Sequence, residues 1–474
     1  MFGCLKRRSI KASACLVLTT ILMMSGSCVA ADTSTAEEFA ALPADIGKAF
    51  LEASLGEASI KVLSVKTPQV PTERYNLVAT PYKTETPDVA GCLVLKSQTG
   101  PVRPEEIEGL EKFLLDYPLP RCNIMNYYFR KFYIPWMLEW VYQRTANPAL
   151  IEKAVRMAYS TAAHRNDRFG VENIGGYGPL AIWPHYRGYE WKRGKLSIGC
   201  GLASFSPLSF QTVPARMIAQ RPELWDRKLD GVTYKQIALD LIRESFQSTD
   251  FVMKKCRDPE TNLIREPRGF GTGRGDIIWN RTLVYMVGTV PLIDALEAFQ
   301  IESERAEMLD AVNAAMLDEF FRTMRREEID GRTVYVWLYR SNKERQGTTE
   351  GFGHGGFDLR YLEFLYQSGR YPNFTEEWVQ RMADTIAFCC KGPGHYWDKL
   401  DGHTKPKKEE GFRHYRYLPA LEGYIWLAPL RQEIQTNIVD YILDTLLADC
   451  LDSRAVWEIL KLRESKREST RGRS

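Results

Sequence analysis

Three side chains that can exchange protons lie at four-residue steps in the segment TEGFGHGGFDLRYL, residues 349–362. They are Glu350, His354 and Asp358. The four glycines around His354 predict an irregular approach to a helix that begins near Asp358, with backbone open to a ligand. Glu350 and His354 would then lie at a helix N-terminus, where anions are stabilised. One alternative is a role in capping the helix. Another is a metal site, which would require the whole segment to be helical; the four glycines argue against such a helix.

A second segment, GFRHYRYLPALEGY at residues 411–424, puts two arginines and a histidine beside two tyrosines, immediately before a predicted helix. Nearby positive charge lowers the pKa of a phenol, so Tyr415 or Tyr417 is a candidate general base near neutral pH. Arg413 and Arg416 would supply that charge. The alternative is a pair of packed tyrosines whose arginine neighbours are solvated.

A third candidate is the sequence Trp279-Asn280-Arg281 at the start of another predicted helix. The amide of Asn280 can donate a hydrogen bond to a carboxylate, and the alternative is that it caps the helix. This triplet ends the loop 265–280, which is rich in glycine and aromatic residues, as is the loop 173–194. Such loops are where binding usually occurs. Neither is a phosphate loop, because no Gly-Lys-Ser/Thr sequence follows.

Helices dominate the pattern from about residue 106 onward. Apolar residues at helical spacing predict helices over residues 292–299, 309–320, 378–386, 418–428 and 434–446. Residues 333–339 are the strand-like exception. We predict an all-α fold, an (α/α) toroid in which about six or seven helical hairpins close into a ring and one set of loops builds a cleft. The alternative is an open α-solenoid, which would need a repeat of fixed period, and none is visible.

The N-terminal region differs from this helical body. Residues 1–30 predict a secretory signal, with a basic start, a short apolar stretch and a cleavage site after Ala30. Lipoprotein processing at Cys28 is the less favoured alternative. Residues 31–105 predict a small appendage with short strands. The protein is therefore predicted to be secreted or periplasmic.

The remaining chain divides into residues 106–460, the predicted catalytic domain, and residues 461–474, a basic tail predicted to be a solvated helix end. No further apolar stretch of membrane length is recognised, so no membrane contact is predicted once the signal is removed.

Composition narrows the partners. The chain has 474 residues, with 63 Lys and Arg against 60 Asp and Glu. Removal of residues 1–30 leaves 59 basic against 60 acidic residues, which gives no support for broad nucleic-acid binding. The 55 aromatic side chains instead suit sugar rings. Seven cysteines remain without a CxxC pair, so we predict no zinc site, no cofactor and mostly buried thiols.

The Glu-Gly-Phe-Gly-His-Gly-Gly-Phe-Asp segment at 350–358, with the Arg-Tyr-Leu-Pro-Ala-Leu-Glu stretch at 416–422, resembles the secreted bacterial (α/α)-toroid polysaccharide lyases. The pattern is most similar to polysaccharide lyase family 38, which acts on uronic-acid polymers such as glucuronan and alginate. The resemblance covers most of residues 106–455. It implies an enzyme that cleaves an acidic polysaccharide by β-elimination.

The resemblance also implies a role for each candidate. Glu350 in its protonated form, Asn280 and His354 would neutralise the carboxylate of the uronate, which makes the C5 proton acidic and stabilises the enolate-like intermediate. Tyr415 or Tyr417 would remove that proton and return it to the glycosidic oxygen. The two tyrosines leave the assignment of the base open.

Arg413 or Arg416 would orient the sugar acid and lower the pKa of the tyrosine. Further substrate contacts would come from the two long loops, through Trp183, His185, Tyr186, Tyr189, Trp279 and Arg281. Two other functions stay open. A glycoside hydrolase on the same toroid would need two carboxylates, for which Glu350, Asp358 and Asp276 are available. A non-catalytic glycan-binding protein would use only the aromatic loops.

Overall fold

The structure, a computed structural model, describes the helical body of the chain and one short N-terminal helix, α2 (Thr33–Ala41). The described residues are 33–41, 100–120, 129, 131–169, 180–183, 201–267, 270, 275–341, 347–402, 412–414, 421–446 and 453–471. The predicted signal at 1–30 and most of the predicted appendage at 31–105 lie outside them.

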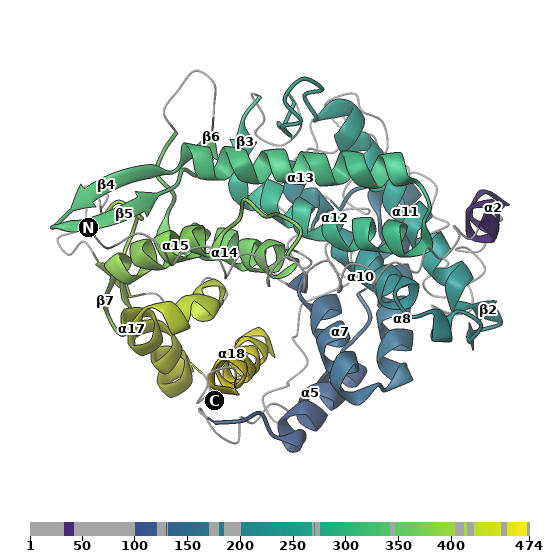
Figure 1. The fold of residues 1–474 in the computed structure, drawn as a ribbon, viewed down its shortest axis with the longest axis horizontal. Coiled ribbons are helices and arrows are strands. Elements are labelled where there is room, and N and C mark those ends of the chain that lie inside the picture. Colours follow the sequence, from purple (N-terminus) through teal and green to yellow (C-terminus); the bar gives the residue numbers. More distant parts are fainter. Residues whose placement is uncertain are drawn as a thin grey trace, which may run out of the picture.

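The described helices alternate between inner and outer positions around a ring (Figure 1). The inner helices are α7 (Ile134–Thr145), α10 (Leu208–Ala219), α12 (Trp279–Phe299), α14 (Phe352–Gln367), η4 (Glu422–Leu430) and α18 (Ser453–Arg471). The outer helices are α5 (Pro104–Asp116), α8 (Pro148–Ala163), α11 (Tyr234–Lys255), α13 (Ser303–Thr323), α15 (Glu376–Cys389) and α17 (Gln432–Ile434), which continues through η5 (Gln435–Asp440) and η6 (Ile442–Leu446). Each outer helix leads into the next inner one, so the described chain forms six hairpins.

Helix α18 closes the ring onto its first helices. Trp457 of α18 stacks on Tyr133, which directly precedes α7, with ring centroids 6.3 Å apart. Arg463 of α18 pairs with Glu106 of α5 at 2.7 Å. This closure confirms the predicted (α/α) toroid, because an open solenoid would leave its first and last helices apart.

The C-terminal part of α18 differs from the predicted solvated tail. Lys461 forms ion pairs with Glu363 and Glu458, and Arg463 is 5% exposed. A basic helix end is solvated only when no carboxylate of another helix lies within reach, and here the closing helix meets such carboxylates. The prediction of a solvated tail beginning at residue 461 is therefore wrong for its first residues.

The connections between helices differ in length at the two ends of the ring. The long ones lead into inner helices and span residues 164–207, 256–278, 324–351 and 390–421, whereas the connections 146–147 and 300–302 lead out of them. Antiparallel hairpins make the inner helices parallel, so their N-termini meet at one end of the ring, and the long connections belong to that end. The described residues of the first and third constellations lie at the ends of these connections and in the first two turns of α14 and the first turn of α12.

Helix α12 is apolar on all sides because other helices of the ring enclose it. Among the described helices it alone is long and apolar enough to cross a membrane, and 83% of its most apolar window is buried inside the structure. The expectation that no apolar stretch of membrane length follows the signal is therefore wrong for Trp279–Phe299.

Helix α14 begins at Phe352, not near Asp358 as predicted, so it runs through three of the glycines. Their small size serves packing. A side chain on Gly423 of η4 would place its Cβ 1.8 Å from the carbonyl oxygen of Gly356, so the backbones of α14 and η4 touch there. The expected irregular approach is wrong, because helix-to-helix contact outweighs the low helix propensity of glycine.

The strands are short and lie in the connections. They are β1 (Lys228–Leu229), β2 (Val232–Thr233), β3 (Ile277–Ile278), β4 (Arg325–Ile329), β5 (Arg332–Val336), β6 (Arg340–Ser341), β7 (Cys390–Gly392), β8 (His395–Trp397) and β9 (Phe412–His414). The strand predicted over 333–339 is confirmed for residues 333–336, which lie in β5 and form a hairpin with β4, whereas residues 337–339 lie beyond its end. The antiparallel pair β3–β6 ties two long connections together, whereas β7, β8 and β9 form a three-stranded sheet within the connection 390–421.

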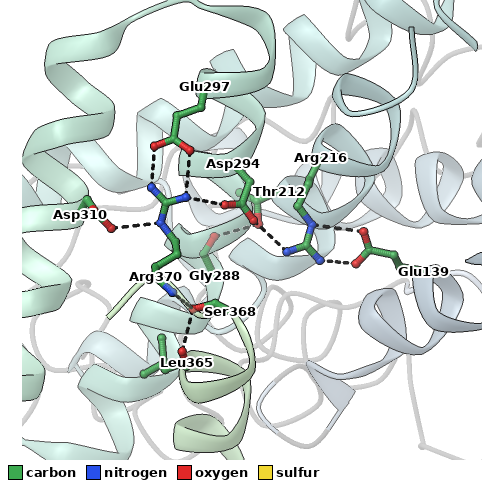
Figure 2. Close-up of polar contacts among 10 residues, drawn as sticks. All are labelled: Glu139, Thr212, Arg216, Gly288, Asp294, Glu297, Asp310, Leu365, Ser368 and Arg370. Atoms are coloured by element: carbon green, nitrogen blue, oxygen red, sulfur yellow. Dashed lines mark hydrogen bonds and ion pairs between the residues drawn. The ribbon is translucent and has the colours of Figure 1, made fainter. Parts of the chain in front are cut away.

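An ion-pair network braces the inner helices at the opposite end of the ring (Figure 2). Asp294 of α12 accepts from Arg216 of α10 at 3.1 Å and from Arg370, which follows α14, at 2.8 Å. Arg216 also pairs with Glu139 of α7, and Arg370 with Glu297 at 2.6 Å. Asp294 thus joins three successive hairpins through one carboxylate.

We expect Asp294→Asn to lower the free energy of unfolding by about 2 kcal/mol, because two partly buried arginines each lose a charged acceptor. Chemical denaturation followed by circular dichroism measures the change. Arg322→Gln is the matched control, since Arg322 is 70% exposed and pairs only within α13; its effect should stay below about 0.5 kcal/mol. Equal effects of the two substitutions would show that the network adds nothing beyond a surface pair.

Candidate active site

Glu350 lies at the end of the connection that leads into α14, and neighbouring backbone holds it there. Its N–H donates to the carbonyl of Trp337 at 3.0 Å, and its carbonyl accepts from Leu400 N–H at 3.2 Å. One carboxyl oxygen, Oε1, accepts from the N–H of Gly351 at 2.7 Å. The residue is 1% exposed. Backbone of the connections 324–351 and 390–421 therefore fixes this carboxyl group at the end of the ring where the inner helices begin.

Asp358 forms a buried carboxyl pair with Glu350. Its Oδ2 accepts from Trp337 Nε1 at 3.0 Å. Oδ1 and the Oε2 of Glu350 are buried, and a side-chain hydrogen bond joins the two carboxyl groups when one of them is protonated. Burial raises the pKa of Glu350 to about 8, and burial together with the charge of Glu350 raises the pKa of Asp358 well above its ordinary value. At neutral pH Glu350 is therefore mainly protonated, the state that the sequence analysis predicts for it.

His354 lies in the first turn of α14 and presents its ring to solvent. Its Nδ1 is 3.6 Å from Glu350 Oε1, and the side chain is 55% exposed. The imidazole stacks on Tyr339, with ring centroids 5.5 Å apart. Partial burial lowers the pKa of His354; the charge of Asp358 opposes this effect and that of Arg281 adds to it. A neutral imidazole at pH 7 can accept a proton or donate its remaining N–H.

Asn280 and Arg281 lie in the first turn of α12, beside the start of α14. The pairing of β3 with β6 brings these turns together, and the N–H of Trp279 donates to the carbonyl of Tyr339. Asn280 is 6% exposed and does not cap the helix, because Ile278 holds the N-cap position. The capping alternative for Asn280 is therefore wrong. The first and third constellations meet in space.

Two tryptophans predicted to contact substrate do not present a ring face. Trp183 is fully buried, and its Nε1 donates to the carbonyl of Thr161 at 3.0 Å. Trp279 is fully buried and packs edge-to-face on Phe320. A ring that stacks on a sugar needs an exposed face, so the prediction of direct contact is corrected for both. Large aromatic side chains in a Gly-rich segment can equally form the core.

The second constellation is described only at its start. Strand β9 places the backbone of Arg413 opposite Tyr396 of β8. Just beyond β8, Lys399 bridges to Gly351, next to Glu350. The side chain of Arg413 lies outside the described part of the structure, as do the whole residues His185, Tyr186, Tyr189, Tyr415, Arg416 and Tyr417. Their roles stay predictions.

The structure adds site residues that the sequence analysis missed. The ring of Tyr339 stacks on His354, and Trp337 donates to Asp358. In the sequence, the only feature that marked these two residues was the strand-like pattern over residues 333–339. Glu266 pairs with Arg281 at 3.1 Å and lies in the loop already noted for its glycines. Lys399 lowers the pKa of Glu350 through its charge, and nothing in the sequence around it pointed to the site.

Neither a metal site nor an exposed thiol is found among the described residues. Among the described residues no group of three or more His, Cys, Asp and Glu side chains is arranged to hold a metal ion. The described thiols Cys256, Cys389 and Cys390 are all buried, as predicted, and burial raises the pKa of each. Helix α14 includes His354, so the expectation that glycines prevent a helix there, which was the ground against a metal site, is wrong.

Comparison with known proteins gives little further guidance. No protein-family model matches the chain, and no curated protein matches it. Among solved structures, the chain is similar to an unsaturated glucuronyl hydrolase, responsible for the degradation of glycosaminoglycan, from Bacillus sp. GL1. The two are 13% identical, with a TM-score of 0.41 over 82% of this chain and 97% of that chain. A likeness this low carries no argument about function, so the fold and the site stand on the contacts described above.

Proposed function

We propose that this protein is a polysaccharide lyase that cleaves a uronic-acid polymer of the glucuronan or alginate type by β-elimination. One observation carries the proposal. A buried carboxyl pair, Glu350 and Asp358, whose pKa values are raised by burial, lies beside the half-exposed imidazole of His354 at the end of the ring where the inner helices begin. Parallel helix N-termini favour an anionic substrate there.

The reaction needs the uronate carboxylate to be neutralised before the C5 proton can leave. Protonated Glu350 donates a hydrogen bond to that carboxylate, and the amide of Asn280 and the positive charge of Arg281 assist. These donors are fixed before substrate arrives, because backbone contacts hold Glu350 and an ion pair holds Arg281. Their hydrogen bonds to the substrate become most favourable when negative charge develops in the enolate-like intermediate.

A base then takes the C5 proton. The electron pair of the C5–H bond forms the C4=C5 double bond, the C4–O bond breaks, and the leaving oxygen receives a proton. The resemblance suggests Tyr415 or Tyr417 for this step, whereas the described geometry offers neutral His354. The base is a group other than Glu350, because the raised pKa of Glu350 keeps this carboxyl group mainly protonated at neutral pH.

Hydrolysis fits the carboxylates less well. It requires one protonated and one ionised carboxyl group on opposite sides of the glycosidic bond. Glu350 and Asp358 are neighbours with raised pKa values, and Asp276 is 2% exposed and paired with Arg340 at 3.1 Å. These contacts support elimination over the hydrolase alternative.

The test is to incubate the purified protein with glucuronan and alginate and follow ultraviolet absorbance of the unsaturated product alongside reducing ends. We expect both signals to rise together. Of Tyr415→Phe, Tyr417→Phe and His354→Gln, the variant that lacks the base should lose about 10²–10⁴-fold in rate. The control Tyr335→Phe, on β5 against α15, should keep full activity. Reducing ends without absorbance would replace the lyase with a hydrolase, and binding without either signal would leave a glycan-binding protein.

A further inference from the structure

Glu266 connects the starts of two inner helices. Its Oε1 accepts from the N–H of Leu202 at 3.0 Å, just before α10, and its Oε2 contacts Arg281 Nη1 at 3.1 Å, in the first turn of α12. The carboxylate is fully buried. Its backbone is held too, because Glu266 N–H donates to the carbonyl of Asp276 at 3.0 Å. Both of its oxygens are engaged by Leu202 and Arg281, so any effect on the reaction passes through these partners.

The chain leaves room for this carboxylate at Gly201. A Cβ at Gly201 would lie 1.9 Å from Glu266 Oε1, and the φ of +46° at this glycine is one that other residues rarely adopt. Glu266 therefore occupies a space that any larger side chain at 201 would fill. The carboxylate is built into the end of the ring, and is not a surface group that happens to meet an arginine.

Arg281 lies in the first turn of α12, and the pairing of β3 with β6 ties the start of this helix to the connection that leads into α14. Its side chain is 10% exposed, and its charge lowers the pKa of His354. The backbone makes the same link, since Trp279 N–H donates to Tyr339, whose ring stacks on His354. A long, flexible arginine holds one geometry only if a partner restrains it, and a charged acceptor does so strongly.

We propose, on the basis of the function proposed above, that Glu266 is a positioning residue that fixes the guanidinium of Arg281 beside His354, so that the carboxylate of an acidic sugar is received there. Glu266 itself touches no substrate. Glu266 thus acts in substrate recognition and not only in stabilising the fold.

Glu266→Gln tests this because it keeps the shape and an acceptor for Leu202 but removes the charge. We expect the Kd for a glucuronan tetrasaccharide, measured by calorimetry, to rise about tenfold. The pKa of His354, measured by NMR of labelled histidine rings with His354→Gln to identify its signal, should shift toward its value in Arg281→Gln, because a released Arg281 no longer holds its charge beside the imidazole. The other titratable groups that act on the ring, Glu350 and Asp358, are the same in both variants.

A matched control separates positioning from stability. Glu139→Gln breaks a similar buried pair, with Arg216, at the opposite end of the ring. It should lower Tm without changing the Kd or the titration of His354. In an Arg281→Gln background, adding Glu266→Gln should change neither readout.

The proposal is overturned if Glu266→Gln lowers Tm yet leaves the Kd and the His354 titration as in the unmodified protein. It is also overturned if the two substitutions act additively. Should the unmodified protein neither cleave nor bind a uronan, the proposed function fails, whereas the His354 titration would still report whether Glu266 holds Arg281. The two failures are therefore distinguishable.

Discussion

Replacing Glu350 with Ala is expected to lower kcat/KM on a uronan by about 10²–10³-fold, because the intermediate loses its fixed hydrogen-bond donor. Glu350→Gln should be milder, since an amide can still donate. It should also change the pH profile. The pKa of Glu350 is raised to about 8, and its protonated form is the active one, so activity should fall as pH rises through about 8. In Glu350→Gln this alkaline decline should disappear.

The measurement is kcat/KM from initial rates of ultraviolet absorbance between about pH 5 and 10. Glu319→Gln, on the outer helix α13, is a suitable control and should retain the decline. An alkaline decline that persists unchanged in Glu350→Gln would assign it to another group and remove Glu350 from the mechanism. At low pH, protonation of His354 adds a second decline if the imidazole is the base, because partial burial places its pKa below the ordinary value.

Replacing Arg454 with Met is expected to lower the free energy of unfolding by about 3–5 kcal/mol. Arg454 is fully buried on α18, where it pairs with Glu458 at 2.9 Å and lies 3.6 Å from Glu363 and 3.7 Å from Glu422. Without it, three buried glutamates would lose the cation that they share, and Lys461 would remain paired with two of them, Glu363 and Glu458. The glutamates belong to three inner helices, so the loss falls on the closure of the ring.

Urea unfolding gives the size of this effect, and pH gives its cause. The pKa of Glu363 is already raised to about 7, by burial and then by the charge of Glu458. Loss of Arg454 should raise it further, and protonation should relieve the penalty, so the difference from the unmodified protein should shrink toward pH 5. Glu464→Gln removes an exposed pair with Arg144 and should cost at most about 1 kcal/mol. A pH-independent loss in Arg454→Met would instead indicate a packing defect.

The helical character of the chain was predictable because apolar spacing reflects burial directly. Leu309, Val312, Met316 and Phe320 lie on one face of α13 and are all buried. Loop composition likewise marked the end of the ring that holds the site, since glycine and aromatic residues accumulate where backbones must turn and contact ligands. Glu350, His354 and Asn280 were all nominated from these local signals.

Burial of particular side chains was not predictable in this way. Trp183 and Trp279 looked like sugar-stacking residues but are enclosed by the core, and Lys461 and Arg463 looked solvated but meet buried glutamates. Nothing within about ten residues of each distinguishes the two outcomes. The decision depends on which other helix arrives opposite, and that partner lies far away in the chain.

The sequence by itself determined the helices, the long connections and the side chains able to do chemistry, because propensity, periodicity and turn composition act over a few residues. The tertiary structure decided which of these side chains meet. Only the ring brings Glu350 and Asp358 together, gives Asp358 its hydrogen bond from Trp337, and pairs Arg281 with Glu266. The pKa of Glu350 follows from that enclosure, since desolvation depends on every group packed around a carboxyl and not on its neighbours in the chain.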